Sequence, residues 1–221
     1  MQNKWYFIFL LILLACGGKN PKPTTSDTAP ARLPFFGEPS ILSREENGVL
    51  IIDTVYPSIP NFSLRNQEGV LITQDDVKNK IYVADFFFTT CPTICPVMKS
   101  QMLRVYEAFL NEPRLIILSH SIDPEHDSVP VLKEYADRLQ VTAPRWNFLT
   151  GNKDTIYTLA EYYMASAAED PTAPGGFIHS GAFILVDNNR FIRGYYDGTK
   201  PEDVDQLLKD IPVLLREITQ P

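Results

Sequence analysis

The chain has 221 residues, of which 20 are Lys or Arg and 27 are Asp or Glu, so its formal net charge is −7 at pH 7. No cluster of basic residues interrupts this acidic balance, which argues against nucleic acid as a partner. The length that remains after the N-terminal segments described next is that of one domain. Three cysteines leave at least one without an intrachain partner.

The first fifteen residues have the pattern of an export signal. Lys4 precedes an apolar run over 5–14, which is shorter than the roughly twenty residues needed to span a bilayer. The run ends in Leu13-Leu14-Ala15-Cys16, which resembles a bacterial lipoprotein box. We therefore predict cleavage before Cys16 and acylation of its thiol, which anchors the protein without crossing the membrane. An ordinary signal peptide with an incidental cysteine is the alternative.

We divide the chain into a lipoprotein signal peptide over 1–15, a tether over 16–34 and a globular domain over 35–221. The tether carries four prolines together with Lys, Thr, Ser and Asp and has almost no apolar residues, a composition that cannot bury a core. Loss of the signal peptide leaves 19 basic and 27 acidic residues, a net charge of −8. The expected location is the bacterial cell envelope, on the extracytoplasmic, periplasm-facing side.

The most informative stretch is an apolar strand, expected from Ile81 to about Phe88, that ends shortly before Cys91. Cys95 follows after three intervening residues, and Pro96 after it suits the first turn of a helix. The two cysteines therefore lie at the carboxyl end of a strand, where open α/β sheets place their sites. The helix N-terminus should favour thiolate over thiol.

The rest of the globular part alternates between strand and helix patterns. A strand is expected at 49–55, a hairpin from 61–64 and 70–72, and a short helix after Thr73. Further strands are expected at 114–120, 146–149, 182–186 and 191–196, and helices at 131–139, 154–165 and from about Pro201, with Pro212 kinking or ending the last one. This order predicts an α/β, thioredoxin-like fold, with an added N-terminal β-hairpin and a mixed sheet flanked by helices.

Three histidines are candidates for a site near the cysteines. His120 and His126 flank the end of the strand at 114–120, and His179 precedes the hairpin strand at 182–186. In thioredoxin-like folds the segment that enters this hairpin passes beside the cysteine loop and carries a proline. This chain has no proline between Phe177 and Ala182, and His179 stands near that place instead.

Cys91, Cys95 and a remote His179 together resemble the Sco/SenC family, whose members handle copper in the assembly of cytochrome c oxidase. The likeness covers about residues 53–215 and includes the run from Phe87 to Pro96, the Ser121–Asp127 segment and His179-Ser180. It implies a copper metallochaperone that binds Cu(I), and Cu(II) as a second state, through Cys91, Cys95 and His179.

The residue chemistry agrees with this resemblance. Two thiolates and one imidazole suit Cu(I) better than Ca²⁺, Mg²⁺ or Mn²⁺. A structural zinc site usually takes a fourth protein ligand. Asp123 is a candidate for orienting the site or docking a partner, and a plain turn residue ahead of Pro124 is its alternative.

The implied recipient is the dinuclear copper site of cytochrome c oxidase subunit II. Other copper chaperones, thioredoxin-like reductants and the membrane are further expected partners, and the protein is expected to be a monomer. A thiol–disulfide reductase acting on the cysteines of that subunit is the alternative function, because the same cysteine pair serves both chemistries.

Two other interpretations fit less well. A purely structural disulfide is common in exported proteins but needs no imidazole. A peroxiredoxin needs Thr or Ser three residues before its reactive cysteine, where this chain has Phe88 or Pro92.

Overall fold

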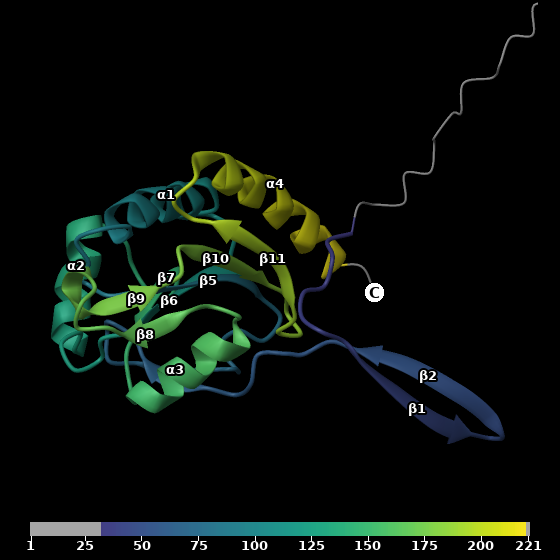
Figure 1. Cartoon of the computed structure of the whole chain (residues 1–221). Coiled ribbons are helices and arrows are strands. Elements are labelled where there is room, and N and C mark those ends of the chain that lie inside the picture. Colours follow the sequence, from purple (N-terminus) through teal and green to yellow (C-terminus); the bar gives the residue numbers. More distant parts are fainter. Residues whose placement is uncertain (1–31, 220–221) are drawn as a thin grey trace, which may run out of the picture. The chain divides into compact units, whose positions relative to one another are not determined.

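The computed structural model describes residues 32–219, and the predicted signal peptide, nearly all of the tether and Cys16 lie outside them. The predicted division at 15 and 34 therefore stays a prediction. At the centre of the described part is a five-stranded mixed sheet in the order β11-β10-β5-β6-β7 (Figure 1). Its strands are β5 (Ile81–Phe87), β6 (Leu115–Ser121), β7 (Trp146–Leu149), β10 (Ala182–Val186) and β11 (Ile192–Asp197).

The three strands β5, β6 and β7 are parallel, and every residue in them is buried. Their largely apolar sequences, buried without alternation, are typical of a sheet that is covered on both faces. β10 pairs antiparallel with β5 and with β11. The predicted thioredoxin-like mixed sheet is confirmed.

In the described part of the chain, four α-helices cover the sheet: α1 (Cys95–Ala108), α2 (Val129–Leu139), α3 (Lys153–Tyr162) and α4 (Pro201–Glu217). α1 and α4 lie side by side on one face, and α3 lies on the other (Figure 1). Tyr135 of α2 packs on Phe87 and Phe148, on the same face as α1. Within the described residues no helix combines the length and apolar character that a membrane crossing requires.

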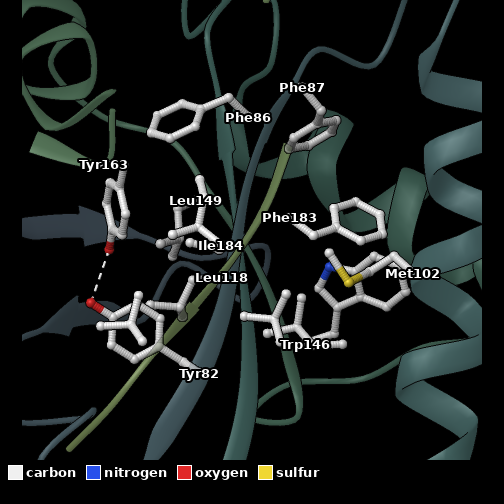
Figure 2. Packing of buried hydrophobic residues seen from close by; sticks show 14 of the residues in the cluster. Tyr82, Phe86, Phe87, Met102, Leu118, Trp146, Leu149, Tyr163, Phe183 and Ile184 are labelled. Atoms are coloured by element: carbon white, nitrogen blue, oxygen red, sulfur yellow. Dashed lines mark hydrogen bonds between the residues drawn. The ribbon is translucent and has the colours of Figure 1, made fainter. Parts of the chain in front are cut away.

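Alternation along the strands divides the core into two layers. Figure 2 shows Tyr82, Phe86 and Tyr163 on one side of the strands, with a hydrogen bond of 3.2 Å between the two tyrosine hydroxyls. Met102, which belongs to α1, and Trp146 lie on the other side (Figure 2). Each layer buries aromatic rings that stabilise the sheet beneath the cysteine loop.

Three short hairpins accompany the central sheet. The predicted one is β3 (Ser63–Arg65) with β4 (Leu71–Thr73), and β2 (Val49–Val55) was also predicted. Its partner β1 (Ser40–Glu46) was missed, because its charged and polar residues hide any alternation. The third hairpin, β8 (Ala167–Glu169) with β9 (Phe177–His179), was also missed.

Two local predictions are wrong. The segment after Thr73 forms successive turns instead of a helix: Asp76 accepts a hydrogen bond from the Thr73 amide, but the chain enters β5 too soon for helical bonds to follow. Of the two outcomes predicted for Pro212, a kink or an end of the helix, the end is wrong, because α4 continues to Glu217. Buried Leu214 and Leu215 beyond the proline keep the last turns packed on the core, which offsets the lost hydrogen bond.

Candidate metal centre

The cysteine loop connects the carboxyl end of β5 to the start of α1. The Cys91 amide donates to the carbonyl of Phe88 at 3.2 Å, which closes a turn directly after the strand. Ile94 caps α1, so Cys95 is its first residue and Pro96 its second. The predicted placement of both cysteines at this edge of the sheet is confirmed.

His179 reaches the cysteine loop from the end of β9. A short 3₁₀ turn over Pro174–Gly176 precedes this strand and packs on the cysteine loop. Gly175 has φ +82°, and a Cβ there would lie 2.8 Å from the Phe88 ring and 3.2 Å from Pro92. Only glycine allows both this left-handed backbone and this close approach.

The side chains of Cys91, Cys95 and His179 converge on one point. The His179 Nε2 atom is 3.2 Å from the Cys95 Sγ and 3.8 Å from the Cys91 Sγ, and all three ligand atoms lie within 4.8 Å of one another. The residues are 9%, 6% and 9% exposed, and both cysteines are free thiols. A zinc ion lies about 2.3 Å from a sulfur ligand and about 2.0 Å from a nitrogen ligand. With these bond lengths, three ligands in a plane around one ion place sulfur and nitrogen about 3.7 Å apart, which is close to the two distances measured from Nε2. The cluster has the dimensions of a three-ligand metal site.

The second ring nitrogen fixes the tautomer of His179. Nδ1 lies 3.1 Å from the carbonyl oxygen of Ser180, which can only accept a hydrogen bond. Nδ1 therefore carries the proton, and the lone pair of Nε2 points at the two sulfurs. Burial lowers the pKa of His179, although the bond to Ser180 opposes this. The ring is thus held neutral, as a metal ligand must be.

The two thiols differ in acidity. Burial alone would raise the pKa of Cys91, but hydrogen bonds from Thr93 and Cys95 outweigh it and hold that pKa below the usual value. The pKa of Cys95 is raised, first by burial and then by its hydrogen bond to Cys91. The expectation that the helix N-terminus acidifies Cys95 is therefore wrong, because desolvation is the stronger effect at this buried position.

The other candidates lie outside this cluster. Asp123 accepts a bond from the His126 amide, as a turn residue does, and its carboxylate makes no hydrogen bond to the cluster in the part of the chain described. His120 is fully buried and stacks on Phe86, whereas His126 is exposed and contacts Asp127. Among the described residues, the cluster of potential metal ligands contains neither of these two histidines.

A surface pocket gives access to the cluster. Its polar lining residues are Cys91 and His179 of the cluster and Thr93. The remaining lining residues are apolar: Ile94, Ala173, Pro174, Phe177 and Ile178. Beneath Cys95 lies Asp85, which the sequence did not single out because it sits inside an apolar strand. Burial raises the pKa of Asp85 to about 7, although a hydrogen bond from Ser119 opposes the shift.

A thioredoxin-like domain that carries two cysteines and a histidine in one buried cluster defines a class of redox-active or metal-handling proteins. A protein-family model described as SCO1/SenC matches residues 54–216. This match covers most of the chain, so the chain belongs to the SCO1/SenC family.

Three relatives illustrate the family. The SCO1 protein homolog of Bacillus subtilis (strain 168) is 29% identical over 166 residues, which is 74% of this chain and 86% of the relative. The structure of BsSco, described as a Sco-family cytochrome c oxidase assembly protein with a disulfide switch, matches with TM-score 0.63 and 28% identity over 72% of this chain and 93% of its own. Arabidopsis thaliana ScoI with copper bound matches with TM-score 0.60 and 25% identity, over 72% and 98%.

Proposed function

We propose that this protein is a metallochaperone that binds Cu(I) through Cys91, Cys95 and His179. The observation that carries the proposal is the neutral His179, whose Nε2 lone pair meets both sulfurs. A disulfide or a dithiol reductant has no use for such a nitrogen, whereas a soft metal ion does. The copper-bound Arabidopsis relative supports copper as the ion.

The geometry suits a cargo that must be given up again. Three ligands beside a surface pocket leave a side of the ion open to an incoming thiolate or imidazole, so the ion can pass by stepwise ligand exchange. A closed cage of four protein ligands would resist this exchange. The lower pKa of Cys91 supplies one thiolate readily, while binding at Cys95 must release a proton.

We infer that the recipient is the dinuclear copper site of cytochrome c oxidase subunit II. The description of BsSco as an oxidase assembly protein supports this choice. Acylation of Cys16 would hold the domain at the periplasm-facing membrane surface, near a membrane-bound oxidase. Mass spectrometry of membrane-extracted protein should find acylated Cys16 as its first residue, and an intact Met1 would contradict the anchor.

A thiol–disulfide reductase is the second candidate. The unequal acidity of Cys91 and Cys95 favours it, because one thiolate can attack a disulfide while the buried thiol resolves the intermediate. The disulfide switch of BsSco supports the same pair chemistry.

Replacing His179 separates the two functions. His179→Ala should weaken Cu(I) binding at least about tenfold, or ~1.4 kcal/mol, because one of three ligands is lost. Reduction of a model disulfide should change little, since it needs only the sulfurs. X-ray absorption of the copper-loaded protein should lose its nitrogen scatterer.

His126→Ala is the matched control, because His126 lies outside the cluster. It should keep two sulfur scatterers and one nitrogen scatterer. If His179→Ala leaves both the affinity and the spectrum unaltered, the copper site is wrong and the reductase becomes the better proposal.

A further inference from the structure

Asp127 is a buried carboxylate that the copper chemistry does not use. It lies between β6 and α2 with no exposed surface. Across residues 32–219, its only ion-pair partner is His126, and no Lys or Arg neutralises it. A buried carboxylate without such a cation is costly unless hydrogen bonds satisfy its oxygens. Hydrogen bonds must therefore compensate for the burial of Asp127.

Both of its oxygens bind Thr89 of the cysteine loop. Oδ2 accepts from the Thr89 amide at 3.1 Å and from the Ser121 hydroxyl at 2.6 Å. Oδ1 accepts from the Thr89 hydroxyl and from Nδ1 of His126, the latter at 3.1 Å. Asp127 thus joins the end of β6 to the loop that follows β5.

Thr89 lies close to the first cysteine in that loop. It is two residues before Cys91, inside the turn that the Cys91 amide closes on Phe88. The segment between β5 and α1 has no regular secondary structure, so few backbone bonds fix it. The clamp of Asp127 on Thr89 supplies an anchor from outside the loop.

We propose that Asp127 is a positioning residue that holds the cysteine loop in the conformation that presents the Cys91 sulfur to His179. The copper part of this inference rests on the proposed function, but the effect on the cysteine pair does not. The clamp is in place while both cysteines are free thiols. Formation of a Cys91–Cys95 disulfide must draw the sulfurs together and move the loop against this clamp. Asp127 therefore favours the dithiol over the disulfide and preorganises the copper ligands.

The test uses the reduced and oxidised whole protein. Asp127→Ala should shift the dithiol–disulfide equilibrium toward the disulfide at least about tenfold, which makes the midpoint potential about 30 mV more negative. It should also weaken Cu(I) binding and broaden the spread of copper–sulfur distances measured by X-ray absorption. Asp127→Asn keeps an oxygen for the Thr89 amide and should restore most of both properties.

Asp187→Ala is the matched control. Asp187 is nearly as well buried, 3% exposed against 0%, and accepts bonds from the Asn189 and Phe191 amides. Unlike Asp127 it also pairs with Arg193, and it lies at the β10–β11 turn, away from the cysteine loop. Its loss should lower stability while leaving the midpoint potential and copper spectrum unchanged. If Asp127→Ala behaves like Asp187→Ala, the positioning role is overturned.

A second pair keeps the test valid if Asp127→Ala does not fold. Thr89→Val removes only the hydroxyl that binds Oδ1, and Thr89→Ser retains it. Thr89→Val should shift the potential in the same direction and Thr89→Ser should not; equal potentials would overturn the proposal. Because the potential is measured without copper, it decides the role of Asp127 even if the wild-type protein fails to bind Cu(I).

Discussion

The cysteine side and the histidine side of the cluster are built in different ways. The cysteines follow β5, a fully buried strand at the centre of the five-stranded sheet. His179 ends β9, which within residues 32–219 pairs only with β8 in a separate two-stranded sheet. We call residues 174–179 the histidine arm. Two ligands thus belong to the core, and a surface hairpin supplies the third. A mutation should therefore be able to disturb the histidine side without disturbing the cysteine side.

The largest expected effect is on the core side. Cys91→Ser or Cys95→Ser should abolish tight Cu(I) binding, because a hydroxyl is a poor ligand for a soft ion. Either change should also abolish the intramolecular disulfide. The measurement is copper retained per protein after desalting, together with a thiol count after oxidation. One tightly bound copper per protein in Cys91→Ser would contradict the assignment of ligands.

A smaller effect is expected where the histidine arm meets the cysteine loop. Gly175→Ala should displace the arm, since the new Cβ would lie 2.8 Å from the Phe88 ring. We expect Cu(I) affinity to fall about tenfold, equal to ~1.4 kcal/mol, while reduction of a model disulfide stays near wild type.

Gly176→Ala is an unusually close control for this change. Gly176 has φ +83°, nearly the same as Gly175, but a Cβ there would meet nothing within 4 Å. Both variants carry a similar left-handed backbone cost of about 1–2 kcal/mol, and only one collides with the cysteine loop. Equal copper affinities in the two variants would show that the arm is not seated by this contact.

The third prediction concerns the two sulfurs themselves. Because hydrogen bonds lower the pKa of Cys91 while burial raises that of Cys95, an alkylating reagent should modify Cys91 first. The rate at Cys91 should level off at a lower pH than that of an ordinary thiol. Peptide mass spectrometry of the copper-free protein over a pH series measures both rates. Faster modification of Cys95 would reverse the assigned roles in thiol exchange.

The same contrast explains how much of the protein could be predicted from its sequence. The core side was predictable because its signals are local: a mostly apolar run, the cysteine spacing and Pro96 specify a strand, a loop and a helix. The pairing of β8 with β9 was not, because Ala167–Glu169 has no strand pattern of its own and forms only against the arm. His179 was found through the family resemblance and the missing proline.

The electrostatics were less predictable than the positions. The acidity of Cys95 was misjudged because a helix N-terminus is visible in a sequence, whereas burial depends on the whole fold. The Asp127 clamp on Thr89 joins residues 38 apart, and no periodicity indicates such a contact. Polar side chains inside apolar strands, such as Asp85, are the signal that sequence reasoning could have used.

The smallest expected net effect comes from two titrating groups buried in the core side, Asp85 in β5 and His120 in β6. Burial raises the pKa of Asp85 to about 7 from an ordinary 3.8. Its contribution to stability is thus complete below pH 3.8 and is lost as the pH rises toward 7. Burial lowers the pKa of His120 to about 4 from 6.5, so its contribution is complete above pH 6.5 and is lost as the pH falls toward 4.

These two dependences have opposite signs over the same pH range and should largely cancel in the wild-type protein. Each shift corresponds to about 3–4 kcal/mol, so removing either group should reveal the pH dependence that the other one causes.

Asp85→Asn should become less stable as the pH falls from about 6.5 to about 4, because only His120 then takes up a proton on unfolding. His120→Phe, which keeps a ring against Phe86, should become more stable over the same fall, because unfolding then releases the proton that Asp85 holds in the folded state. Urea unfolding of the reduced, copper-free protein at a series of pH values measures both slopes. Slopes of the same sign in the two variants would contradict this prediction. Burial disfavours the charged form of each group, and a carboxylic acid becomes charged by losing a proton, whereas an imidazole becomes charged by gaining one. The stabilities set by the two groups must therefore change in opposite directions with pH.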